Sequence, residues 1–256
     1  GFDFTPGDRL EVRGKDGLYW LGDLNFRIKN ASGEWISYST ASARKPVIPL
    51  ETSGSVLAAA DLRPTLPDDL PLEITRYYED NQGDLVLRLR LKNTSTSTVE
   101  LGALGIPMAF NNILEGKSLD ETHAQNVFFD PYIGEDSGYL EVKRLSGVGS
   151  GLLVLPSENM PFEAYRPLND DPSRRSVVFE GFHEWMSHSL AYAEQEWKGV
   201  EQWNEPTSTI LKPGESKNFA LKLVPTIGVK GTQQKLIEEK RPVVIGIPGY
   251  VLPQNV

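Results

Sequence analysis

Residues 180–205, EGFHEWMSHSLAYAEQEWKGVEQWNE, contain two of the three histidines and three of the five tryptophans of the chain, together with many carboxylates. Aromatic faces of this kind pack against the C–H side of a sugar ring, while carboxylates and amides bond its hydroxyl groups. The residues with these properties, and therefore the predicted carbohydrate-binding residues, are Trp185, Trp197, Trp203, Glu184, Asn204 and Tyr192. The alternative is that the tryptophans are core or covering residues of a sheet.

The two histidines of this segment do not form a zinc motif. A zinc protease requires two histidines four residues apart on one helix face, whereas His183 and His188 are five residues apart. Five residues turn a helix by about 500°, which displaces the second imidazole by about 140° from the first. The sequence predicts no metal site and no cofactor.

The elements that position these residues are predicted to be strands. Apolar and polar residues alternate over 85–92, the polar run 93–97 reverses the chain, and a second strand covers 99–110. The apolar parity of this second strand shifts by one residue beside Gly102 and Gly105, as it does at a β-bulge. We therefore expect both strands to be part of one broad, curved antiparallel sheet.

The rest of the pattern is also rich in strands. It predicts hairpins over 24–38 and 139–155, a closing strand region over 207–224, a proline-rich loop over 61–72 and a long polar connection over 111–138. Helices are expected over 184–197 and 232–240. The predicted fold class is all-β: a large antiparallel β super-sandwich with one or two short helices.

Composition excludes several classes of function. The formal net charge of -9 argues against nucleic acid and anionic membranes as partners, because both require a basic surface. A neutral or cationic glycan is compatible with this charge. The absence of cysteine rules out disulfides and thiolate chemistry, and no apolar run is long enough to predict a membrane span.

The strand pair with its threonine- and serine-rich turn resembles the sugar-handling β-sandwich superfamily that includes galactose mutarotase. More specifically, the chain resembles a domain family of unknown function, which forms the N-terminal region of large secreted fungal and bacterial proteins predicted to carry an (α/α)6 six-hairpin glycosidase. The segments that carry this resemblance are ITRYYEDNQGDLVLRLRLKN, LGALGIPMAFNN, THAQNVFFDPYIGEDSGYLEVKRL, PFEAYRPL, EGFHEWMSHSLAYAEQEW and RPVVIGIPGYVLP.

The resemblance implies an N-terminal carbohydrate-associated domain that binds or orients a polysaccharide beside a catalytic domain. The rival hypotheses are an epimerase, hydrolase or lyase in its own right, and a structural domain without ligand. Mutarotase chemistry needs a histidine acid and a carboxylate base. Glu205 precedes a strand led by Pro213-Gly214 and matches the carboxylate, but residues 106–110 lack the histidine, for which His123 is the substitute candidate.

The expected organisation is a β super-sandwich over 1–245, followed by a strand or linker over 246–256 toward a C-terminal (α/α)6 domain. The first residue is not methionine, which is consistent with removal of a signal peptide or with a cut within a longer sequence. The triplets at Asn30 and Asn93 are glycosylation acceptors. We therefore expect a secreted, extracellular glycoprotein.

Overall fold

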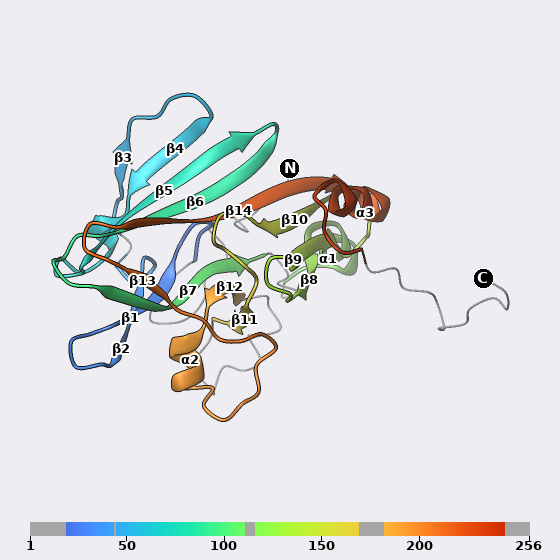
Figure 1. Cartoon of the computed structure of the whole chain (residues 1–256). Coiled ribbons are helices and arrows are strands. Elements are labelled where there is room, and N and C mark those ends of the chain that lie inside the picture. Colours follow the sequence, from blue (N-terminus) through green and yellow to red (C-terminus); the bar gives the residue numbers. More distant parts are fainter. Residues whose placement is uncertain (1–18, 44, 111–115, 169–181, 244–256) are drawn as a thin grey trace.

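The chain folds into two antiparallel β-sheets that pack face to face, with short helices at their periphery (Figure 1). The computed structural model describes residues 19–43, 45–110, 116–168 and 182–243. The predicted all-β super-sandwich is confirmed, with three short α-helices in the described part of the chain. The predicted segment 246–256 lies outside the described residues.

The larger sheet has eight strands, and most of its neighbouring strands are also neighbours in the sequence. In spatial order they are β3 (Ile48–Leu50), β4 (Val56–Asp61), β5 (Leu72–Asn81), β6 (Asp84–Asn93), β14 (Ser216–Ile227), β10 (Ser150–Pro156), β9 (Tyr139–Arg144) and β8 (Val127–Tyr132). The predicted loop over 61–72 contains only the short 3-10 helix η2 (Arg63–Thr65).

The smaller sheet has six strands and is built around β7. In spatial order the strands are β11 (Ala164–Pro167), β12 (Phe182–His188), β7 (Val99–Ala109), β1 (Asn25–Lys29) and β2 (Trp35–Ser39). The sixth strand, β13 (Thr209–Leu211), pairs with the first residues of β7. The predicted hairpins over 24–38 and 139–155 are both confirmed.

The turn after β6 carries the chain from one sheet to the other, so the expectation that the two central strands share a sheet is wrong. Asn93 is buried here, and its Nδ2 donates to the carbonyl oxygens of Ser97 at 2.7 Å and Leu211 at 2.8 Å. Its Oδ1 accepts a hydrogen bond from the backbone nitrogen of Ser95. The bond to Leu211 of β13 ties the turn to the six-stranded sheet. Because β6 and β7 lie in different sheets, the leucines of β6 and the apolar residues of β7 face the same core from opposite sides.

The predicted bulge in β7 is confirmed and lies at Gly102. Arg27 of β1 pairs with Ala103 and Ile28 pairs with Leu101, so that Gly102 is the extra residue between them. A Cβ atom at Gly102 would lie 2.3 Å from the nearest ring atom of Trp35. β7 is buried on both faces, and only glycine leaves room for the indole.

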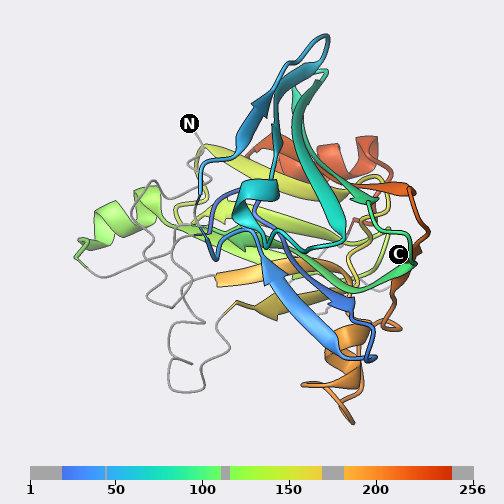
Figure 2. The ribbon, with the colours of Figure 1, turned by 90° about the vertical axis from the view of Figure 1, so that its left-hand side faces the viewer.

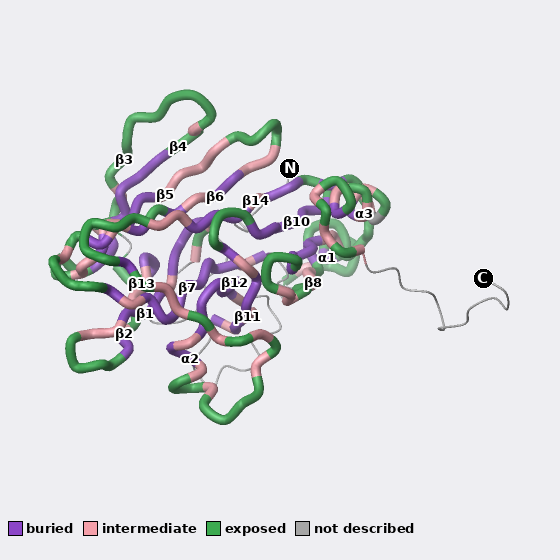
Figure 3. Tube along the Cα trace, viewed as in Figure 1, coloured by how far each residue is buried: buried purple, intermediate pink, exposed green. Residues whose placement is uncertain are grey.

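The main core lies between the two sheets (Figure 3). Its largest completely buried side chains are Trp185, Phe26, Phe162 and Phe219. Each fully buried side chain of this size contributes about 1.5–3 kcal/mol through loss of apolar surface from water. This core holds the strands rigidly, so it fixes the positions of the polar residues on their outer faces.

The helices lie at the periphery of the sandwich (Figures 1 and 2). α2 (Leu190–Glu194) packs on the outer face of the six-stranded sheet, and α3 (Gly228–Glu238) packs on β10 and β14 of the other sheet. α3 confirms the predicted helix over 232–240, although it begins four residues earlier. α1 (Leu119–Gln125) begins at a capping box and, with β8, gives regular structure to the connection predicted over 111–138.

The predicted helix over 184–197 is wrong for its first half, because residues 184–188 belong to β12. In β12, Trp185 points into the main core while Glu184 and Met186 point to the outer face, which is the period of a strand. None of the helices in the described ranges is long and apolar enough to cross a membrane.

We predict that Gly102→Ala lowers the free energy of unfolding by about 1–3 kcal/mol, because the added methyl group forces the Trp35 ring or β7 to move. Gly231→Ala is the matched control. Gly231 lies within α3, where an added Cβ has only ordinary contacts, so alanine should leave stability unchanged or raise it by up to about 1 kcal/mol. Urea denaturation of both variants measures the difference, and equal stabilities would contradict the prediction.

Candidate functional site

The outer face of the six-stranded sheet carries a cluster of polar side chains, most of which are buried. The alternation of β1 that sends Phe26 into the core places Asn25 and Arg27 on this outer face, and β11 and β12 add Arg166 and Glu184. We call Asn25, Arg27, Arg166, Glu184, Tyr192 and Glu196 the arginine cluster.

Glu184 is the most deeply buried charged group of the cluster, with 1% of its surface exposed. Its carboxylate accepts hydrogen bonds from Arg166 Nε and from Asn25 Nδ2, each at 2.7 Å. A Cβ atom at Gly105 would lie 2.6 Å from its carboxyl carbon, so the second glycine of β7 makes space for it. A buried ion pair is tolerated only when its remaining polar atoms are also bonded, and Asn25 fulfils that condition.

Tyr192 of α2 lies against both arginines. The guanidinium carbon of Arg27 is 3.7 Å from the centre of the Tyr192 ring, and that of Arg166 is 4.6 Å from it. Trp197 stacks on the same tyrosine with 5.1 Å between ring centres. These cation–π and aromatic contacts fix α2 on the sheet.

Glu196, which follows α2, forms an ion pair with Arg27. Arg27 Nη1 donates to Glu196 Oε2 at 2.7 Å and to Gln195 Oε1 at 3.0 Å, and Nη2 donates to the second Glu196 oxygen. This is the two-point arrangement that matches a guanidinium to a carboxylate. The hydrogen bond from Arg27 lowers the pKa of Glu196.

An open depression of about 510 Å³ lies next to the arginine cluster. Its lining comes from the turn between β1 and β2, the first residues of β2 and the end of α2: Gly33, Glu34, Trp35, Ile36, Glu194 and Gln195. Trp35 Nε1 donates to Glu194 Oε2 at 2.7 Å, which joins the two walls. The depression thus offers carboxylate and amide groups around an indole, a combination suited to hydroxyl-rich ligands.

The segment that covers the cluster, residues 189–208, is closed at its base by one buried carboxylate. We call it the cover segment. Glu163 accepts hydrogen bonds from the Ser189 hydroxyl at one end, and from the Thr207 hydroxyl and backbone nitrogen at the other, the last at 3.1 Å. Leu190 N also donates to Thr207 O at 3.1 Å. Burial raises the pKa of Glu163, although these hydrogen bonds act in the opposite direction.

His188, the last residue of β12, also holds Thr207 at the end of the cover segment. Its Nδ1 is 2.8 Å from Thr207 Oγ1, and its ring meets Phe219 of the core edge-on. Because the Thr207 hydroxyl donates to Glu163, it accepts from His188, which places the proton of the neutral imidazole on Nδ1. Burial lowers the pKa of His188 to about 4, and the nearby Lys217 acts in the same direction.

The structure brings together half of the predicted carbohydrate-binding residues. Glu184, Tyr192 and Trp197 meet in or beside the arginine cluster. Trp185 is completely buried and stacks on Phe162 at 3.7 Å, so it has no face for a sugar. Trp203 is 90% exposed on the cover segment.

Asn204 is held by the protein itself, because its Nδ2 donates to the carbonyl oxygen of Glu163 at 2.8 Å. The catalytic candidates do not meet. Glu205 is exposed on the cover segment, and His123 is exposed on α1, which packs on β9. Figures 1 and 2 both show α1 well apart from the cover segment.

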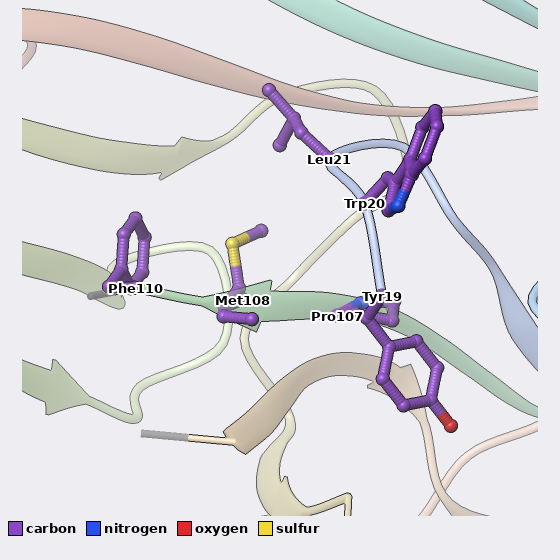
Figure 4. A pocket seen from close by; sticks show the side chains of 7 residues that line it. Tyr19, Trp20, Leu21, Pro107, Met108 and Phe110 are labelled. Atoms are coloured by element: carbon purple, nitrogen blue, oxygen red, sulfur yellow. The ribbon is translucent and has the colours of Figure 1, made fainter. Parts of the chain in front are cut away.

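The end of β7, which lacks the mutarotase-like histidine, lines a narrow cavity of about 10 Å³ among the described residues (Figure 4). Aromatic and aliphatic side chains of residues 19–21 and 107–110 surround it. This volume is at the lower limit for a single water molecule. It therefore has no room for a sugar.

Sequence reasoning missed the two arginines and Glu196. For Arg27 a signal was present, because the parity of residues 24–28 already places Asn25 and Arg27 opposite Leu24, Phe26 and Ile28. Among the residues that the structure describes, no group of three or more histidine, cysteine, aspartate or glutamate side chains is placed to hold a metal ion.

Comparisons with known proteins identify a family and related folds. A family model described as a family of unknown function, DUF5695, matches residues 1–256. No match was found among curated proteins. A solved polysaccharide lyase superposes with a TM-score of 0.62 and 17% sequence identity, covering 86% of this chain and 28% of the lyase. At this identity the similarity shows a shared fold, and the chain spans about a quarter of the lyase's length.

Two further structures superpose less well. A presumed aldose 1-epimerase from Escherichia coli K12 has a TM-score of 0.45 and 11% identity, covering 77% of this chain and 74% of the epimerase. The GH36 alpha-galactosidase AgaB from Geobacillus stearothermophilus has a TM-score of 0.44 and 11% identity, covering 82% of this chain and 31% of the galactosidase.

We predict that acid destabilises the protein through His188. The unfolded chain binds a proton at this histidine near pH 6.5, whereas the folded protein binds it only near pH 4. Stability is therefore fully present above pH 6.5 and falls by up to about 3 kcal/mol as the pH drops to 4. The raised pKa of Glu163 acts in the opposite sense, so the difference between wild type and His188→Asn isolates the histidine.

Thermal or urea unfolding between pH 7 and pH 4 measures this difference, with His123→Asn as the exposed control. The stability of His188→Asn should fall less steeply with acid than that of wild type, whereas His123→Asn should follow wild type. Parallel curves for wild type and His188→Asn would contradict the prediction.

Proposed function

The chain belongs to the DUF5695 family, a family of unknown function, and from this premise we propose that it is a carbohydrate-binding domain of a longer protein. In this proposal it binds or orients a polysaccharide beside a C-terminal (α/α)6 catalytic domain in a secreted protein of the glycoside-hydrolase type. Residues 246–256 would connect the two domains.

One observation carries the proposal: the outer face of the six-stranded sheet combines an accessible depression with polar and aromatic groups. The depression is of a size that commonly holds sugars and other small ligands. Glu34, Glu194 and Gln195 provide oxygen atoms that accept hydrogen bonds from hydroxyl groups. Trp203, on the neighbouring cover segment, presents an exposed indole for a longer chain to stack on.

The fold supports the proposal in a weaker way. A polysaccharide lyase shares this sandwich as about a quarter of its own length. Because unrelated functions occur on one fold, the shared fold by itself does not establish sugar binding. The site provides the chemical argument, and the fold adds that such a sandwich occurs as one part of a carbohydrate-active protein.

The charge of the chain restricts its partners. A formal net charge of -9 disfavours nonspecific binding to nucleic acid and to anionic membranes, both of which attract basic surfaces. A binding role also fits the separation of Glu205 from His123, since neither forms an acid–base pair with the other. In this proposal, catalysis belongs to the other domain of the parent protein.

We predict that Glu34→Ala and Trp203→Ala each weaken polysaccharide binding by about tenfold, equivalent to about 1.4 kcal/mol. Glu34→Ala removes a carboxylate that accepts hydrogen bonds from sugar hydroxyls in the depression. Trp203→Ala removes a surface on which a sugar ring can stack. Phe128→Ala is the matched control, because Phe128 is an exposed aromatic residue on β8, away from this face. Titration calorimetry against a panel of soluble polysaccharides measures the affinities.

The absence of binding to every polysaccharide by the wild-type domain would refute the proposal. Release of reducing sugar by the isolated domain would instead support an enzymatic role. Equal loss of affinity in Phe128→Ala would show that binding is not confined to the proposed face.

A further inference from the structure

Glu196, whose carboxylate is bonded to Arg27, is more exposed to solvent than Arg27 itself. The Arg27 side chain is 9% exposed, whereas that of Glu196 is 51% exposed. Glu196 lies just beyond the end of α2, so its side chain can turn toward solvent without any change in the strands. Gln195 lines the depression and also accepts a hydrogen bond from Arg27. The arginine is therefore next to the space in which the proposed ligand lies.

Two buried polar atoms beside this arginine have no hydrogen-bond partner among the described residues. They are Arg27 Nε and Asn25 Oδ1. Arg27 and Asn25 are two residues apart on β1 and share its outer face. A buried donor or acceptor that lacks a hydrogen bond is costly unless a further group bonds it. A hydroxyl group can accept from Arg27 Nε, and another can donate to Asn25 Oδ1.

From these observations we infer that Arg27 recognises the carboxylate of a uronic acid residue, and that Glu196 is an internal competitor for the same guanidinium. The inference rests on the proposed function and specifies its ligand class. The uronic acid carboxylate takes the two-point contact now made by Glu196, and hydroxyl groups of the same glycan bond Asn25 Oδ1 and Arg27 Nε.

The charge balance favours exchange over simple addition. Arg166 is already neutralised by Glu184, and Lys29 lies 3.7 Å from Glu100 and 4.0 Å from Glu194. An additional anion would therefore meet a cluster with no spare positive charge. When a sugar carboxylate takes the place of Glu196, the number of negative charges in contact with Arg27 is unchanged and Glu196 moves into solvent. The ion pair given up is partly solvent-exposed and hence weak.

The test compares acidic glycans with neutral forms of the same linkage. Polygalacturonate and a glucuronate-containing glycan are each paired with a carboxyl-reduced form, and calorimetry gives the ratio of acidic to neutral affinity. This ratio should rise about tenfold in Glu196→Ala, which removes the competitor. It should fall about tenfold in Arg27→Lys, which keeps the charge but loses the planar two-point geometry.

Each outcome decides the inference. An unchanged or lower ratio in Glu196→Ala overturns it, as does tighter binding of chitosan oligosaccharides than of either uronide by the wild-type domain. If Arg27→Lys does not fold, the Glu196→Ala ratio alone decides. Binding of the reduced forms without preference for the acidic ones refutes this inference alone, whereas no binding of any glycan refutes the proposed function as well.

Discussion

Burial of β7 on both faces is the constraint on which the rest of the molecule depends. A strand between a core and a covered outer face cannot carry a side chain at every position, and glycine at 102 and 105 leaves room for Trp35 and Glu184. Glu184 then orients Arg166 through an ion pair. Arg166 and Arg27 in turn hold Tyr192, and Tyr192 holds the cover segment on the sheet.

Hydrogen bonds to a buried carboxylate hold the two ends of the cover segment together, whereas apolar packing holds the two sheets together. Glu163 loses hydration on burial, but it bonds donors from both ends of the segment, so one carboxylate brings two chain positions eighteen residues apart together. Tyr192 and Ala191 provide the apolar contacts that accompany this closure. Opening the whole segment would expose Glu163 and the apolar side chains to water. It therefore costs more free energy than the rotation of a single surface side chain.

Much of the fold could be predicted because strand parity is a local property. Leu87, Leu89 and Leu91 alternate as strictly in the structure as in the sequence, and Gly102 lies at the predicted bulge. Residues 184–197 were misassigned because apolar residues there also recur at helical spacing, and only pairing with β7 and β11 decides between strand and helix. The sheet to which a strand belongs is not a local property either. The turn after β6 is held to the other sheet by the hydrogen bond from Asn93 to Leu211, which is far away in the sequence.

The site was less predictable, because it is assembled across β1, β11, β12 and the cover segment. Residue type alone selected Trp185 and Trp197 equally, yet the strand parity of one and the stacking of the other on Tyr192 place them on opposite faces of the sheet. The same arrangement determines where ligand selectivity can be located. Residues between the sheet and its cover are held by several contacts each, whereas Glu34, Gln195 and Glu196 lie at the edge and can change position individually. In the proposed function, discrimination between glycans on this face depends on Arg27 together with those edge residues, whereas Arg166 and Glu184 keep their partners in place.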